Sequence, residues 1–241
     1  MKKRRYSNWL FCAVTMASGV MCAQVRHSAS PTAELRLRVV SSLPGKHRAV
    51  PAVIWLESMA GTPDLPFVPR GHYTLAQKDR TFIPHFQVIP AGSVVQFPNE
   101  DPFFHNVFSL FDGKRFDLGL YEAGSSKSVT FSRAGISYIF CNIHPEMSAV
   151  VIALTTPLYA IADANDSFLL RDIPSGNYKL HLWIEGVPQP FLESLSRTVH
   201  FPPRTVDLGV LKAPIARAKS HNNMFGESYT PDTQSTYSVD H

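Results

Sequence analysis

Cysteine is scarce in this 241-residue chain, and two of its three cysteines, Cys12 and Cys22, lie close to the N-terminus. Beyond residue 22 only Cys141 remains, so that part of the chain cannot form an internal disulfide. A convincing amphipathic helix is lacking as well, while 19 Pro and 13 Gly favour turns and strands. We therefore expect neither a disulfide scaffold nor a protein built from long helices.

The first 23 residues have the pattern of a secretory signal peptide. Four basic residues at 2–5 precede an uncharged stretch from Trp9 to Met21, and small residues surround a cleavage point after Ala23 or Gly19. The alternative is an uncleaved membrane anchor. We expect removal of residues 1–23, no stable membrane span afterwards, and a periplasmic location.

A basic excess is also lacking once this leader is removed. The whole chain carries 23 Lys and Arg against 19 Asp and Glu, and the four basic residues of the leader account for the difference. A neutral mature protein has no basic footprint for nucleic acid, so we exclude that class of partner. A single thiol, Cys141, in an oxidising compartment is at risk unless something binds it, and a metal ion is the simplest occupant.

Short apolar stretches separated by turn signals predict an all-β protein. Leu35, Leu37 and Val39 alternate with charged residues, and similar stretches follow at the spacing of an antiparallel sandwich. The strands fall into three series, at 33–60, 72–155 and 157–212. The polar segment 213–241 is typical of a disordered tail.

The segment Cys-Asn-Ile-His-Pro-Glu-Met at 141–147 offers a thiolate, an imidazole and a thioether three residues apart, and His105 offers a second imidazole upstream. Singly, each has an ordinary explanation: a core cysteine, a surface histidine, a core methionine. Together, two His and one Cys with a weak axial Met are the ligands of a blue-copper electron-transfer site. We predict such a site, with the metal ligands His105, Cys141, His144 and Met147.

Residues 72–155 resemble the cupredoxin family, in particular the short-loop kind with Cys-x-x-His-x-x-Met seen in amicyanin and pseudoazurin. The stretch from Phe82 to Val107 resembles the segment that leads to that family's first His ligand. The resemblance implies a Greek-key β-sandwich with one type 1 copper per chain. It also implies that hydrogen bonds of Asn106 tie the two ligand segments together. Glu146 departs from the pattern, because related loops often carry an apolar or aromatic residue there. The resemblance therefore does not predict the surface that a redox partner would contact.

The third series resembles a carboxypeptidase-regulatory, transthyretin-like β module, since residues 159–185 carry an Asp/Asn turn, a Phe strand and Pro-x-Gly-x-Tyr. The opening strands of that module are missing directly upstream, yet residues 33–60 resemble them. This implies a cupredoxin inserted into a second small β-sandwich built from both flanks. The alternative is an N-terminal extension with a separate C-terminal domain. Because the module carries no evident catalytic group, a scaffold or docking role is the default.

The whole chain is similar to exported bacterial proteins labelled methylamine-utilisation or plastocyanin-like. The leading hypothesis is a periplasmic one-electron carrier that exchanges electrons with unidentified donor and acceptor redox proteins. We predict no enzymatic activity, because no catalytic acid/base pair is evident. The alternative function is copper storage or delivery, which the absence of Met-rich or His-rich tracts disfavours. A third hypothesis is a metal-free interaction module.

Overall fold

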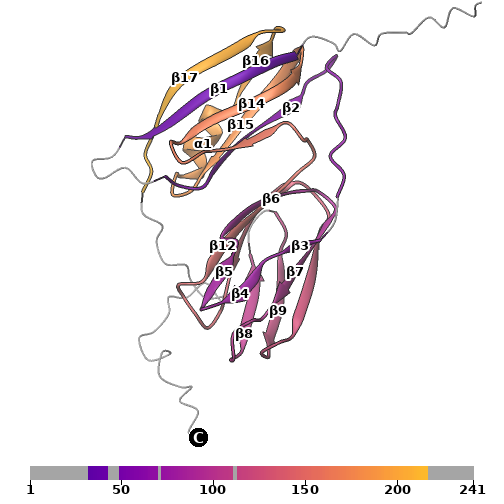
Figure 1. The fold of residues 1–241 in the computed structure, drawn as a ribbon, viewed down its shortest axis with the longest axis vertical. Helices are drawn as coiled ribbons and strands as arrows, with labels where there is room; N and C mark the ends of the chain where they lie inside the picture. Colours follow the sequence, from indigo (N-terminus) through magenta and orange to yellow (C-terminus); the bar gives the residue numbers. More distant parts are fainter. Residues whose placement is uncertain (1–31, 43–48, 70–71, 111–112, 217–241) are drawn as a thin grey trace, which may run out of the picture. The chain divides into compact units, whose positions relative to one another are not determined.

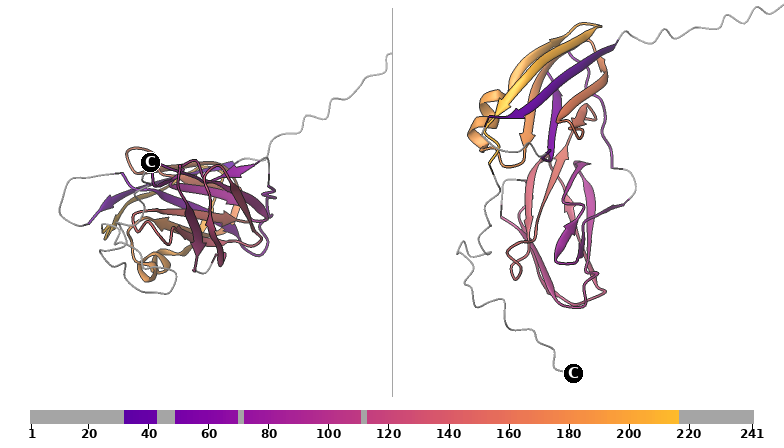
Figure 2. Two further views of the ribbon diagram at one scale, coloured as in Figure 1. Left: turned by 90° about the horizontal axis from the view of Figure 1, so that it is seen from below. Right: turned by 60° about the vertical axis from the view of Figure 1, so that its left-hand side comes forward.

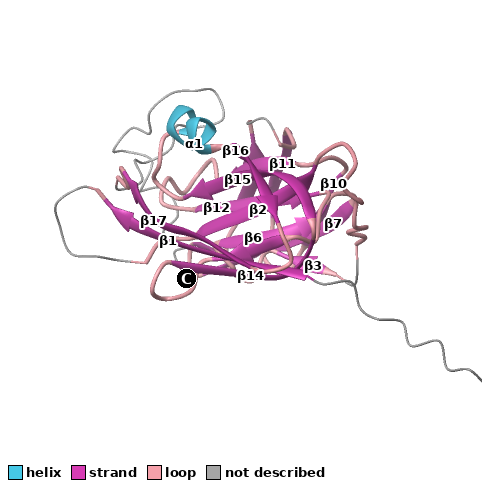
Figure 3. Ribbon diagram, turned by 90° about the horizontal axis from the view of Figure 1, so that it is seen from above, coloured by secondary structure: helices cyan, strands magenta, loops and turns pink. Residues whose placement is uncertain are grey.

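The computed structural model describes residues 32–42, 49–69, 72–110 and 113–216. The expected signal peptide and most of the expected tail lie outside these ranges. The regular elements of the described residues are strands, apart from one seven-residue helix, α1 (Gln189–Leu195), as Figure 3 shows. The predicted all-β fold class is confirmed.

The middle of the chain forms a two-sheet sandwich. One sheet has the order β10-β7-β3 and the other β6-β12-β11-β8-β9, with a small β4–β5 hairpin beside them (Figure 1). The β3–β7 and β6–β12 pairs are parallel and the others antiparallel. The strands are β3 (Tyr73–Thr74), β4 (Ala76–Lys78), β5 (Thr81–Ile83), β6 (Phe86–Pro90), β7 (Ser93–Pro98), β8 (His105–Ser109), β9 (Phe116–Tyr121), β10 (Ser126–Phe131), β11 (Gly135–Phe140) and β12 (Ser148–Leu154). The β-sandwich expected for this part of the chain is confirmed.

Two features of this sandwich differ from the sequence expectation. The apolar residues from Phe82 to Ile89 predict one strand, but the structure divides this stretch at Pro84-His85 into β5 and β6, because proline has no N–H to donate to a strand ladder. Strand β9 was not predicted. Only Tyr121 in it is buried, and Gly119 has a φ of +63°, so the apolar alternation that marks a half-buried strand is weak there.

The strands before and after this sandwich share two further sheets. Strand β1 lies between β14 and β17, and β2 lies between β13 and β15, with β16 at the edge of the second sheet. Figure 2 shows the indigo N-terminal strand beside the yellow C-terminal one. Their bounds are β1 (Thr32–Ser41), β2 (Ala52–Ser58), β13 (Tyr159–Ile161), β14 (Ser167–Pro174), β15 (Gly176–Ile184), β16 (Arg197–Phe201) and β17 (Thr205–Ala213). The chain thus leaves this flanking sandwich after β2 and re-enters it at β13. The likeness to a transthyretin-like module stays a prediction.

Two segments were expected to lack regular structure. The first is the Pro- and Gly-rich segment 61–71, which predicts a linker, and its described residues 61–69 contain no strand or helix. The expected tail began at residue 213, but Ala213 is the buried last residue of β17.

Strand β12 faces two hydrophobic cores, because successive side chains of a strand point to opposite faces. One set packs in the core of the middle sandwich together with Cys141 and Met147: Ala149, Val151 and Ala153. The other set packs in the core of the flanking sandwich: Val150, Ile152 and Leu154. Trp183 of β15 stacks on Phe86, with ring centroids 5.2 Å apart, and donates its indole N–H to the Tyr138 hydroxyl at 3.0 Å. The strand that follows the predicted ligand loop is therefore buried on both faces.

Candidate metal centre

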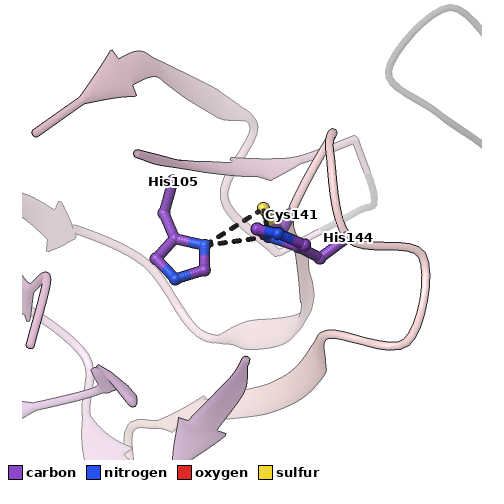
Figure 4. Close-up of side chains that lie close together, drawn as sticks. All are labelled: His105, Cys141 and His144. Carbon is purple, nitrogen blue, oxygen red and sulfur yellow. Dashed lines mark hydrogen bonds between the residues drawn. The ribbon is translucent and has the colours of Figure 1, made fainter. Parts of the chain in front are cut away.

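Three of the four predicted ligands converge at one end of the middle sandwich (Figure 4). His105 begins β8, Cys141 follows the last residue of β11, and His144 lies in the next turn. The Cys141 Sγ lies 3.7 Å from the Nδ1 atom of His105 and 3.6 Å from that of His144, and the two Nδ1 atoms are 3.1 Å apart. His105 and Cys141 are fully buried, whereas His144 is partly exposed.

The loop that carries Cys141 and His144 is closed by backbone hydrogen bonds. Phe140 of β11 pairs with Ser148 of β12. Inside that pair, the Cys141 N–H donates to the Met147 carbonyl oxygen at 3.3 Å, and the Met147 N–H donates to the His144 carbonyl oxygen at 3.0 Å. The Met147 side chain is fully buried in the same core cluster as Cys141. Its role as an axial ligand stays a prediction.

The Cys141 sulfur lies among backbone donors. Burial raises the pKa of this thiol, while the backbone N–H groups of Asn106, Ile143 and His144 favour the thiolate and oppose that rise. Asn106 was expected to tie the ligand segments together. Its backbone N–H contacts the Cys141 sulfur. Its side-chain amide instead donates to the Asp117 carboxylate of β9 at 2.7 Å.

The electrostatics of the site favour neutral imidazoles. Burial lowers the pKa of His105, and the hydrogen bond to Asp101 only partly opposes it. Burial also lowers the pKa of His144, and the nearby His105 lowers it further. Neutral imidazole is the form that binds metal ions. A metal cation in the site would supply the positive charge that stabilises a buried thiolate.

The donor atoms are spaced for one small metal ion. Bonds of about 2.0 Å to nitrogen and about 2.3 Å to sulfur, spread at about 120°, hold sulfur and nitrogen about 3.7 Å apart. The observed Sγ–Nδ1 separations are 3.7 and 3.6 Å. A thiolate with two imidazoles suits copper and also zinc. The residues therefore fit the predicted cofactor.

Phe103 covers the imidazole pair. Its ring centroid lies 5.2 Å from that of His105 and 5.6 Å from that of His144. The guanidinium of Arg80 lies over the same ring, 5.4 Å from the centroid. From the sequence, Phe103 or Phe104 could join Pro145 in an apolar docking patch around His144, and Phe104 is 48% exposed. The side chains that surround the imidazoles are thus both aromatic and cationic.

Asp101 was missed as a functional residue. Its carboxylate Oδ2 lies 2.8 Å from the His105 Nε2, the ring nitrogen that faces away from Cys141. Burial alone would raise the pKa of Asp101, but the N–H groups of Arg80, His105 and Asp79 together lower it. The sequence showed an acidic turn before His105, but an irregular loop has no fixed period that would reveal which carboxylate reaches the ring.

Several solved structures are similar to part of this chain. The purple cupredoxin from Nitrosopumilus maritimus is 21% identical, with a TM-score of 0.31, over 34% of this chain and 99% of its own. Amicyanin from Paracoccus versutus is 25% identical, with a TM-score of 0.32, over 36% of this chain and 85% of its own. The copper-containing nitrite reductase from Thermus scotoductus is 23% identical, with a TM-score of 0.33, over 41% of this chain and 25% of its own. No family model and no curated protein matches the chain.

Proposed function

We propose that this protein binds one copper ion through His105, Cys141 and His144, with Met147 as a weak axial ligand, and carries single electrons in the periplasm. The observation that carries the proposal is the convergence of two imidazole nitrogens and one thiol sulfur, 3.1 to 3.7 Å apart, in a buried site. This donor set matches the equatorial ligands of blue-copper centres.

Bound copper would supply one-electron redox chemistry. The chain's own contribution is to hold the donors so that they need not move when the charge of the ion changes. His105 belongs to a strand, and Cys141 is held by the backbone donors and the closed loop described above. A soft thiolate favours Cu(I), and imidazoles bind both oxidation states. Support for the electron-carrier function comes from this rigidity.

His144 is the ligand best placed for exchange with a partner. It is partly exposed, whereas His105 and Cys141 have no exposed surface. A redox protein that docks over the loop would approach copper most closely through this imidazole.

The periplasmic location is supported by the leader pattern of residues 1–23. Among the described residues, no helix is long and apolar enough to cross a membrane.

The visible spectrum of the copper-loaded protein tests the proposal. An intense thiolate-to-Cu(II) charge-transfer band, lost on reduction and regained on oxidation, is expected for an electron carrier. A colourless Cu(I) form that resists oxidation would instead support copper storage or delivery. Selective uptake of zinc, or uptake of no metal, would contradict the proposal. The Cys141→Ser variant is the control, because it removes the sulfur.

A further inference from the structure

We propose that Asp101 is a positioning residue: it selects which ring nitrogen of His105 faces the metal site, and its negative charge lowers the reduction potential of copper bound there. The statement about the ring nitrogen concerns the metal-free protein. The statement about the potential rests on the proposed function.

Asp101 is built into the fold as an acceptor of three N–H groups. It is 5% exposed. Its Oδ2 lies 2.8 Å from the His105 Nε2 and 3.0 Å from the backbone N of Arg80, and its Oδ1 lies 2.7 Å from the backbone N of Asp79. Its own backbone N–H donates to the Asn99 side chain at 3.1 Å. The carboxylate therefore has a single well-defined position.

Two of the three donors come from the β4–β5 hairpin, whose turn has an uncommon backbone. Asp79 and Arg80 have φ values of +52° and +54°. Two successive residues with positive φ are the mark of a type I′ hairpin turn, and this conformation is disfavoured for residues other than glycine. Here it aims both N–H groups at Asp101. A hairpin remote in sequence from the ligands thus anchors the carboxylate that contacts His105.

The hydrogen bond to Asp101 determines the tautomer of His105. A carboxylate only accepts hydrogen bonds, so the Nε2 of His105 must carry the proton. In a neutral ring the Nδ1 atom is then the unprotonated one. That atom faces the Cys141 sulfur at 3.7 Å. Asp101 therefore prepares His105 as a ligand before any metal binds.

The same hydrogen bond affects the metal. An anionic acceptor on the far nitrogen makes the imidazole a more basic ligand. A more basic ligand favours the more highly charged ion, Cu(II), over Cu(I). Copper in this site should therefore be harder to reduce than in a variant with a neutral residue at position 101.

The first experiment uses the metal-free protein labelled with 15N in its histidine rings. In the native protein, the nitrogen spectrum should show His105 protonated at Nε2 and unprotonated at Nδ1. In Asp101→Ala, the Nδ1-protonated form should become a substantial or the major species. A folded amide spectrum confirms that the variant is intact. An unchanged His105 tautomer in the folded variant would overturn the inference.

The second experiment compares Asp101→Asn with Glu100→Gln, each loaded with copper. Both variants remove one negative charge, at neighbouring positions. Glu100 is exposed and lies 3.6 Å from Lys78, so Glu100→Gln leaves the contact with His105 intact. Asp101→Asn should lower the affinity for Cu(II) by about 10- to 100-fold, as changes to such outer contacts do, and the affinity for Cu(I) by less, so that the ratio of the two affinities falls. Glu100→Gln should leave the ratio nearly unchanged.

The outcomes separate the two proposals. Equal shifts of the potential in both variants would mean that only the total charge matters, and would overturn the role assigned to Asp101. If the native protein takes up no copper, the proposed function fails together with the statement about the potential. The nitrogen spectrum of the metal-free protein still decides the statement about the tautomer.

Discussion

Cys141 and Met147 face each other across the closed end of the β11–β12 hairpin, where the Cys141 N–H donates to the Met147 carbonyl oxygen at 3.3 Å. Residues six apart in sequence are therefore joined through their backbones, independently of their side chains. Because Phe140 and Ser148 pair directly outside this contact, the loop should keep its course when the side chain at 147 changes.

Met147→Leu should keep the metal and raise its reduction potential. Leucine fills a similar volume in the core but removes the thioether, and a more apolar three-coordinate site favours Cu(I). Redox titration of the copper-loaded variant measures the shift. Complete loss of copper, or an unchanged potential, would show that Met147 is a structural residue only.

Cys141→Ser should abolish the thiolate-to-copper band, because a hydroxyl cannot replace the soft thiolate. The backbone N–H groups that face the sulfur remain in the variant, so the loop should still fold. Absorption spectroscopy after copper loading gives the measurement. A variant that stays blue would contradict the ligand assignment.

His105→Ala and His144→Ala should both weaken copper binding by more than the roughly 10- to 100-fold that a change in an outer contact costs. Free imidazole should restore binding more readily in His144→Ala, because this position is partly exposed and His105 is fully buried. Copper titrations with and without imidazole make the comparison. Equal rescue of the two variants would contradict the assigned difference in access.

The contact between His85 and Glu185 should stabilise the protein at low pH. The His85 Nε2 lies 2.5 Å from a Glu185 carboxylate oxygen, and its Nδ1 lies 2.9 Å from the Ser148 carbonyl oxygen. Both neighbours can accept hydrogen bonds, so they favour the protonated form of the ring. The hydrogen bond to Glu185 raises the pKa of His85 from its ordinary value of 6.5, against the effect of burial.

A raised folded-state pKa contributes stability that is complete below the unfolded pKa and is lost as the pH rises through the folded value. The free energy of unfolding of the metal-free protein, minus that of Glu185→Gln, should therefore fall as the pH rises above about 6.5. Taking this difference removes the contributions of His105 and His144, whose lowered pKa values act in the opposite direction. A difference independent of pH would show that His85 is neutral in the folded protein.

Tyr138→Phe should cost about 1–3 kcal/mol of stability, because it leaves the indole N–H of Trp183 buried without its acceptor. Tyr159→Phe is the control, since Tyr159 is half-buried and its hydroxyl has no hydrogen bond to a described residue. Urea denaturation measures both variants. Equal costs would show that the contact between Trp183 and Tyr138 adds nothing.

The sequence by itself determined the local features of this protein. Alternating apolar residues predicted most strands, because side chains on a strand alternate between two faces. The spacing of Cys141 and His144 was readable because both lie on one short loop. The matching His105 was recognisable from its neighbours, and the structure brings it to the same place.

Only the tertiary structure decided which distant segments pair. Strand β1 lies between two strands that are more than 120 residues away in sequence. Its alternation of apolar and polar residues does not identify these partner strands. Asp101 reaches His105 only because the β4–β5 turn holds the carboxylate in place. Backbone pairing and contacts through irregular loops depend on where the chain folds back on itself. The local periodicity of the sequence does not predict these long-range contacts.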